Sequence, residues 1–306
     1  MRRGSLMTRK FLWGVIVILL LTNLTTLAVW MNERFSENGQ GVLITDVDER
    51  EPVAKVGDEA ISYEQWTNQL ENKYGRKVLK QMVDQEIVFQ LAEQEGIEIN
   101  EKLIDREVSF LFTMKGALNE EEIKKKEQAW KRDIKYRLFL EELLTKDIKV
   151  NENDVMAYHT NYSEQYEFGE SIQLSHILVN DAETADKVVN ELESGASFAS
   201  LAREYSIDKD TREAGGYLGY IKGDSNYISD DYHRKSLQME EYTYSEPFVV
   251  GNNVAILYLH RYLPEITFSY EEIKPQIERE LALEQIDGVV SANMLWDRME
   301  IEWIYE

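Results

Sequence analysis

Hydrophobic residues recur every three or four positions through the first half of the chain, a period typical of amphipathic helices. A capping box of Ser62 and Gln65 predicts a helix over 63–74, which we expect to end before Gly75. Further apolar stripes predict a helix from Leu79 that ends at Gly96, two helices opened by Asn100 and Asn119, and one over 153–166. A short strand and a turn at 57–58 precede them.

At Ser171 the pattern changes from helical to mixed. Residues 171–179, 217–221, 246–250 and 252–262 are typical of strands, and short helices are expected over 183–193, after Ser197 and over 229–237. The strands and helices follow no regular βαβ order, so we expect a compact α+β unit over 171–263. After Pro264 the helical period returns at Ile273, Ile277 and Leu281, which predicts that the two helical parts pack together.

The N-terminal segment has a composition of its own. Basic residues within 1–10 precede an uncharged stretch over 11–30, and about 20 apolar residues can cross a bilayer as a helix. We expect a cytoplasmic segment at 1–10, a single transmembrane signal anchor at 11–30 and a linker at 31–51, with the remaining chain on the extracytoplasmic side of the cell membrane. A cleaved signal peptide is the alternative, because 26–28 is a weak cleavage site.

The composition excludes several classes of partner and of functional site. The 306 residues carry a net charge of −23, which disfavours nucleic acid as a partner. The absence of cysteine excludes disulfides, thiolate zinc sites and a cysteine nucleophile. We found neither a zinc-ligand spacing nor a phosphate loop, so no cofactor and no metal are expected. The acidic surface and helical ends leave a homodimer open.

Residues 171–263 resemble a parvulin-type prolyl isomerase domain. The matching stretches occur in the family's order: LSHILV, FASLAREYSID, GGYLGYIKG and SEPFVV. Residues 52–170 resemble the helical domain of exported foldases of the PrsA and SurA type, through VAKVGDEAISYEQW, QEIVFQLAEQEGIEIN and VNENDVMAYHTNYSEQYEF. Residues 264–306 fit the helical return that these proteins make. The resemblance implies an α+β fold in which the N- and C-terminal segments form a helical chaperone-like domain. The isomerase domain, a small antiparallel sheet with surrounding helices, is inserted into it.

The resemblance also implies a site. His176 and Asp208 fall at the catalytic positions, and the substrate-binding positions are Leu218, Ile221, Ile228 and Tyr232. By residue type alone, His176 could instead be a satisfied core histidine, and Asp208 could be a turn residue. Leu218 and Ile228 could be ordinary core residues, and Tyr232 could lie on the surface.

Four positions depart from the family pattern. Ala255 occupies the position of a second histidine, and Val250 stands where threonine is common. Ile228 and Ile221 replace the usual methionine and phenylalanine. His260 lies five residues beyond Ala255, so strand alternation predicts that it points to the opposite face. We therefore expect an incomplete hydrogen-bond network and a weakened or absent activity.

The implied function is cis/trans isomerisation of Xaa-Pro bonds in unfolded or newly exported proteins, which assists their folding outside the membrane. Rotation about such a bond faces a barrier of about 18–20 kcal/mol, so catalysis needs neither a strong nucleophile nor a metal. The alternative is a non-catalytic chaperone with a degenerate parvulin site. A third interpretation is an adaptor for a membrane complex. The loop after 171–179 is short and acidic, which argues against recognition of phosphorylated substrates.

Overall fold

The computed structural model describes residues 48–223, 225 and 227–305. The expected anchor at 11–30, the basic segment before it and most of the linker lie outside this range. Within the described residues, no helix combines the length and the apolar character needed to cross a membrane.

The first compact unit covers the described residues up to Lys77. Its hairpin pairs β1 (Ala54–Val56) with β2 (Glu59–Ile61) around a turn in which Gly57 has a φ of +62°. The predicted capping box then opens α2 (Tyr63–Leu70), because the Ser62 side chain accepts from the Gln65 amide and the Gln65 side chain accepts from that of Ser62. The prediction that this helix ends before Gly75 is wrong. A π-helical turn over Glu71–Gly75 continues the helical backbone through the glycine. In such a turn the backbone hydrogen bonds span five residues instead of four.

The predicted helices that follow are α3 (Arg76–Gln94), whose first two residues still belong to the first unit, α4 (Glu101–Thr113), α5 (Glu120–Thr145) and α6 (Glu152–Tyr162). The 3₁₀ turn η2 (Ser163–Tyr166) comes after them. Asn100, Asn119 and Asn151 each cap a helix through their side chains. Phe112 of α4 meets Trp130 of α5 edge to face, with ring centroids 4.9 Å apart, at the centre of the α4–α5 core.

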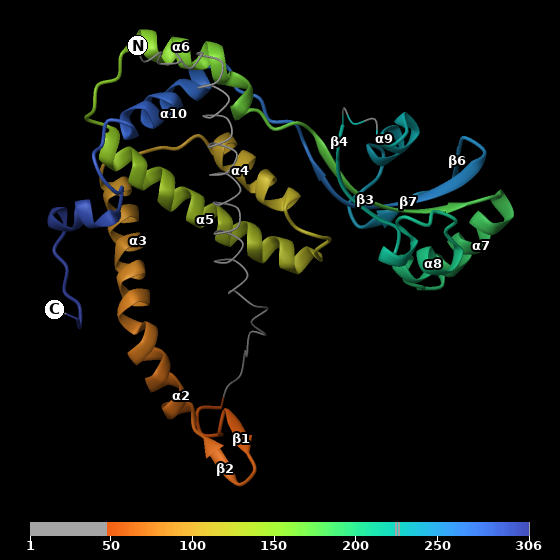
Figure 1. Ribbon diagram of the computed structural model, residues 1–306, viewed down its shortest axis with the longest axis horizontal. Helices are drawn as coiled ribbons and strands as arrows, with labels where there is room; N and C mark the ends of the chain where they lie inside the picture. Colours follow the sequence, from red (N-terminus) through yellow and green to blue (C-terminus); the bar gives the residue numbers. More distant parts are fainter. Residues whose placement is uncertain (1–47, 224, 226, 306) are drawn as a thin grey trace, which may run out of the picture. The chain divides into compact units, whose positions relative to one another are not determined.

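The chain returns to these helices after the α+β unit. Ile273 and Ile277 of α10 (Tyr270–Leu283) are fully buried against Val155 of α6 and Leu103 of α4. The last 3₁₀ segment, η4 (Ala292–Arg298), packs Leu295 against α3 and α5. Figure 1 shows α10 (blue) beside α6 (green), although more than a hundred residues separate them in the sequence. The predicted packing of the two helical segments, with an α+β unit inserted between them, is confirmed.

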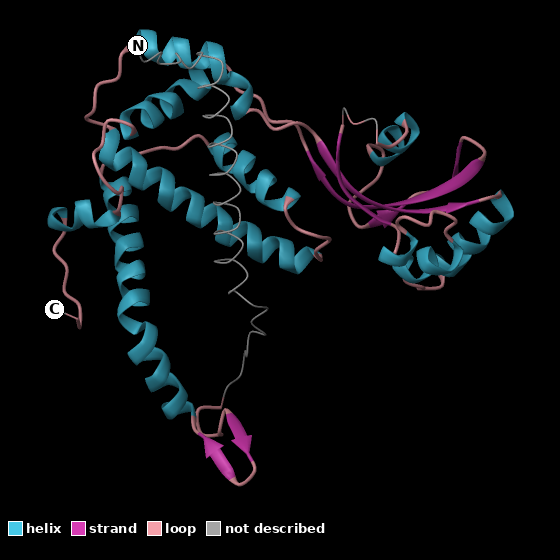
Figure 2. Ribbon diagram, in the orientation of Figure 1, coloured by secondary structure: helices cyan, strands magenta, loops and turns pink. Residues whose placement is uncertain are grey.

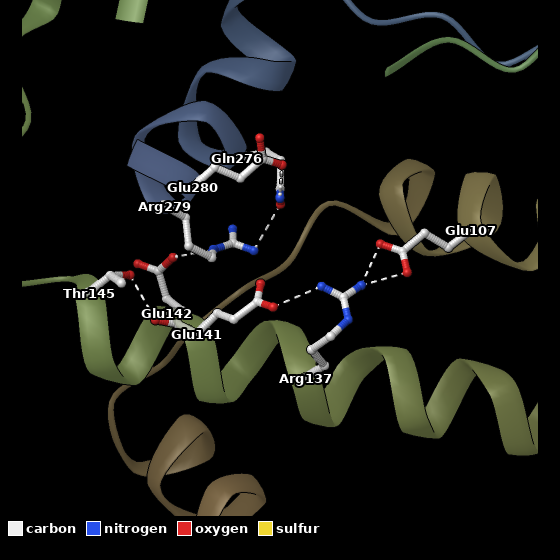
Figure 3. A network of polar contacts seen from close by, with 8 residues as sticks. All are labelled: Glu107, Arg137, Glu141, Glu142, Thr145, Gln276, Arg279 and Glu280. Carbon is white, nitrogen blue, oxygen red and sulfur yellow. Dashed lines mark hydrogen bonds and ion pairs between the residues drawn. The ribbon is translucent and has the colours of Figure 1, made fainter. Parts of the chain in front are cut away.

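A polar network also joins α10 to α5. Figure 3 shows the buried guanidinium of Arg279 between the carboxylate of Glu142, which accepts from Nε at 3.0 Å, and the amide oxygen of Gln276 at 3.1 Å. The Arg279 side chain is only 4% exposed, so these partners, rather than water, stabilise its positive charge. On the neighbouring turns of α5, Arg137 bridges Glu141 and Glu107 of α4.

We predict that Arg279→Ala lowers the free energy of unfolding by about 3 kcal/mol, because it leaves buried partners of a charged group unsatisfied. Lys274→Ala is the matched control on the same helix. Its ion pair with Glu152 is screened by solvent, so its loss should change stability far less than the loss of Arg279. Urea unfolding of both variants measures the difference, and equal effects would contradict the role given to Arg279.

The α+β unit is built on one antiparallel sheet. Its strand order is β4 (Tyr217–Lys222), β3 (Ser171–Val179), β7 (Asn253–Leu263) and β5 (Thr243–Tyr244), and β6 (Phe248–Val250) also pairs with β7. Figure 2 shows these strands in magenta. β3 pairs with β7 along its whole length, and bulges near Leu174 interrupt the register on both sides. A bulge twists a strand and redirects the side chains that follow it.

Different helices pack on the two faces of the sheet. One face packs Ile177, Val179 and Ile256 against α7 (Ala182–Glu193) and α8 (Phe198–Tyr205). The other packs Ala255 and Leu257 against Tyr232 of α9 (Asp230–Ser236). Because side chains alternate along a strand, His176 and Leu178 belong to the α9 face, while Ser175 and Ile177 belong to the other.

A close approach of backbone explains the paired glycines before β4. Gly216 has a φ of +78°, and a Cβ built on it would lie 2.0 Å from the carbonyl oxygen of His176. The Gly216 carbonyl in turn accepts a hydrogen bond from the His176 amide at 2.8 Å. A side chain at 216 would therefore separate β3 from the start of β4.

We predict that Gly216→Ala destabilises the chain by about 3 kcal/mol or more, through overpacking added to a left-handed backbone. Gly219→Ala is the control, because Gly219 has a similar φ of +83° but open space around its Cβ. That variant should lose only about 1–2 kcal/mol from backbone strain. Denaturant unfolding of the two variants separates the cost of overpacking from the cost of backbone strain. A smaller destabilisation at residue 216 than at residue 219 would refute the close-approach argument.

Candidate active site

His176 lies on the central strand of the sheet, opposite Leu257 of β7. His176 is only 7% exposed, and both of its ring nitrogens have hydrogen-bond partners on other side chains. Nε2 lies 2.8 Å from Oδ2 of Asp208 and 2.9 Å from Oγ1 of Thr211. Nδ1 lies 2.7 Å from the hydroxyl oxygen of Tyr232. The histidine is therefore held at both ends of its ring.

The loop after α8 carries two of these partners. It runs along the end of β3, where the Ile207 amide donates to the Leu178 carbonyl at 2.8 Å. That bond places Asp208 beside His176, and the Thr211 hydroxyl donates to Oδ2 of Asp208 at 2.5 Å. The structure thus brings the predicted pair, His176 and Asp208, into direct contact. Thr211 was missed by sequence reasoning, because its contact with Asp208 depends on how the turn after α8 folds.

The protonation states follow from the partners. Burial lowers the pKa of His176, against the hydrogen bond and charge of Asp208, which act to raise it. Burial acts to raise the pKa of Asp208, but the hydrogen bonds from Thr211 and His176 outweigh it and hold that pKa below its ordinary value. Because a carboxylate only accepts, Nε2 of a neutral His176 carries the proton and Nδ1 accepts from the Tyr232 hydroxyl. Burial and the charge of Asp208 raise the pKa of Tyr232, which keeps this donor protonated.

An apolar wall stands next to the histidine. It consists of partly buried side chains that pack against Tyr232 and Leu257: Leu218, Ile228, Met239 and Phe248. The structure therefore gathers the predicted residues Leu218, Ile228 and Tyr232 on the His176 face, and Tyr232 is buried rather than on the surface. Ile221 is 5% exposed and lies in the adjoining cluster with Ile172, Leu174 and Leu259. Met239 and Phe248 were not singled out from the sequence, because their positions beside Tyr232 depend on how the chain between α9 and β7 packs on the sheet.

The structure also places Ala255, which stands at the position of the family's second histidine, and His260. Ala255 is fully buried on the His176 face, opposite Leu178. His260 lies on the other face, where its Nε2 is 2.8 Å from Oγ of Ser175 and its ring meets Tyr217 and Tyr258. Strand alternation thus placed His260 correctly, and it does not contact His176.

Burial lowers the pKa of His260 to about 4, so this histidine stays neutral in the folded chain while its unfolded form takes up a proton below about pH 6.5. The unfolded state then binds more protons between pH 6.5 and 4, and stability falls as pH falls through that window. We predict that His260→Phe removes up to about 1.4 kcal/mol per pH unit of this slope. Unfolding free energies measured from pH 7 to 4 test this, and parallel curves for the two proteins would contradict it.

A small antiparallel sheet with helices on both faces, and a buried histidine paired with a partly buried aspartate beside an apolar wall, define a domain of the parvulin class. Comparisons with known proteins agree. The model of the PPIC-type peptidyl-prolyl isomerase domain matches residues 159–247. The putative peptidyl-prolyl cis-trans isomerase YacD of Bacillus subtilis is 33% identical over 256 residues, which cover 83% of this chain and 86% of YacD.

The foldase PrsA of Halalkalibacterium halodurans is 27% identical over 278 residues, covering 87% of this chain and 77% of that protein. A crystal structure of PrsA from Bacillus cereus aligns with 84% of this chain and 95% of its own, at 21% identity and a TM-score of 0.30. The chain belongs to the PrsA-like family of peptidyl-prolyl isomerases with a PPIC-type domain. The resemblance found in the sequence is confirmed.

Proposed function

We propose that this protein catalyses cis/trans isomerisation of Xaa-Pro bonds in exported polypeptides and so assists their folding outside the cytoplasm. The observation that carries the proposal is the buried His176, held by Asp208, Thr211 and Tyr232 beside an apolar wall. Family membership supports both the reaction and the extracytoplasmic setting.

The wall and the histidine have separate tasks. Leu218, Ile228 and Phe248 offer an apolar surface for a proline ring, which holds the bond next to His176. Rotation twists the amide, so its carbonyl and nitrogen lose their conjugation. A site accelerates the rotation only if it stabilises this twisted form more than either planar form. We assign that task to the fixed polar groups of His176 and Asp208, which need little reorganisation when the bond turns.

A neutral, rigid imidazole suits this task better than a mobile charged one. The reaction transfers no proton and breaks no covalent bond, so a group at the site must not protonate or attack the amide. The lowered pKa of His176 keeps its ring neutral near physiological pH. The raised pKa of Tyr232 keeps the phenol neutral as well.

The helical part supports a second role, the binding of unfolded chains. A cleft of about 470 Å³ lies between α4 and the segment that follows β7. Its lining includes the nearly fully buried Val108 and Phe112, the charged side chains of Arg261, Glu127 and Glu265, and Thr267. Such a mixed surface fits a short extended segment of a client. Chaperone action without catalysis is the alternative function of the whole chain.

The setting of the protein follows from its N-terminal segment. We propose that residues 11–30 anchor the chain as a single span, with residues from 48 onward on the extracytoplasmic side, because basic residues precede that apolar stretch. The anchor would hold the foldase where unfolded exported proteins emerge. A homodimer remains part of the proposal, and sedimentation of the detergent-solubilised chain tests it.

We predict that the protein accelerates the proline-limited slow phase in the refolding of a chemically unfolded client. His176→Ala should reduce the catalysed rate by about tenfold or more, because it removes the imidazole that stabilises the twisted amide. A tenfold loss corresponds to an increase of about 1.4 kcal/mol in the activation free energy. Asp208→Ala should also reduce it, because Nε2 loses its carboxylate partner.

Suppression of client aggregation is the matched readout for binding. It should be equal in wild type and in His176→Ala, since neither His176 nor any of its hydrogen-bond partners lines the cleft. Wild-type protein that suppresses aggregation but leaves the slow phase unchanged would reject the isomerase and favour the chaperone.

A further inference from the structure

We infer that the hydroxyl of Tyr232 holds the His176 imidazole in place of the second histidine that Ala255 replaces. Tyr232 is thus a positioning residue as well as part of the apolar site. This inference rests on the proposed isomerase function, but its structural half can be tested without catalysis.

Among the residues that the structure describes, Nδ1 of His176 has one hydrogen-bond partner. Position 255 carries only a methyl group, which is fully buried in the same cluster as Tyr232. His260 is on the opposite face of the sheet and binds Ser175. The Tyr232 hydroxyl lies 2.7 Å from Nδ1, within the ordinary range for a hydrogen bond.

The chemistry makes the hydroxyl, rather than the aromatic ring, the essential group. Asp208 only accepts, so it fixes the proton of the neutral ring on Nε2 and leaves a lone pair on Nδ1. A phenol is a donor that meets this lone pair, and a phenylalanine in the same place would leave it unpaired. A buried acceptor without a donor is unfavourable, so the imidazole would gain freedom to turn.

Tyr232 is itself held firmly. It is 5% exposed on α9, and its ring meets Phe248 edge to face with centroids 5.7 Å apart. The ring of His176 meets it at the same centroid distance of 5.7 Å. The phenol oxygen is therefore fixed by packing from α9 and β6, and the imidazole is clamped between that oxygen on one side and Asp208 with Thr211 on the other.

The experiment uses the full chain in a mild detergent, with Tyr232→Phe as the variant. This change removes one oxygen and keeps the ring that contributes to the apolar site. Tyr217→Phe is the control, because Tyr217 also accepts a side-chain hydrogen bond, from Gln173 at 2.7 Å, but its ring packs against His260 on the other face.

Two quantities are measured for each protein. Exchange NMR on an unphosphorylated Ala-Pro peptide gives kcat and KM, and ¹⁵N labelling of histidine gives the ring-nitrogen signals, with His176 assigned through His176→Ala. For Tyr232→Phe we expect kcat to fall about tenfold with KM unchanged, the magnitude that loss of one buried hydrogen bond allows. The Nδ1 signal of His176 should move downfield, toward the position of a lone pair without a donor. Tyr217→Phe should change neither.

A Tyr232→Phe protein with wild-type kcat and an unmoved Nδ1 signal overturns the inference. A rise in KM with unchanged kcat also overturns it, since that result assigns Tyr232 to substrate binding alone. If the wild type does not accelerate exchange, the proposed function fails, and the ring signals then decide separately whether Tyr232 holds His176. A wild-type Nδ1 that carries the proton would reject the clamp in that case.

Discussion

The antiparallel ladder between β3 and β7 fixes where each group of the site can lie. It runs the full length of β3 and pairs His176 with Leu257 and Leu178 with Ala255. Because side chains alternate along both strands, this register puts His176, Ala255 and Leu257 on one face and His260 on the other. A slip of one residue would exchange the faces and bury His176 among the apolar residues of α7 and α8.

The edge of β3 that faces away from β7 then completes the site in two steps. On the β4 side, Gly216 approaches the His176 carbonyl so closely that only a glycine fits, and the following chain supplies Leu218. Beyond the start of β4, the loop after α8 pairs with the same edge through the Ile207 amide and places Asp208 beside His176. The helix α9 closes the same face with Tyr232. Residues far apart in the sequence thus meet around the His176 imidazole because the segments that carry them all lie against β3.

Local signals made much of this fold predictable. The capping residues Ser62 and Asn119 predicted helix starts correctly because a cap acts within four residues, and alternation along the single strand β7 placed His260 on the correct face. Gly75 misled the prediction, since a π turn can carry a helix past a glycine. The resemblance of the sequence to parvulins pointed to His176 and Asp208, which the structure brings into contact.

The contact between Tyr232 and His176 could not be predicted in this way. The two residues are 56 positions apart, and the bond depends on how α9 packs over the sheet. The sequence therefore indicated a network left incomplete by Ala255. The structure instead places a phenol at the free nitrogen, which makes an active site physically reasonable without the second histidine.

The central claim is that the wild-type chain is a working prolyl isomerase despite Ala255. Two-dimensional exchange NMR on an Ala-Pro peptide, with and without a catalytic amount of the full chain in detergent, tests it most directly. Uncatalysed exchange takes tens to hundreds of seconds, so cross-peaks between cis and trans signals are absent at sub-second mixing times. The account predicts that the protein produces such cross-peaks. Their absence at enzyme concentrations where the chain is folded and still binds unfolded clients would contradict it.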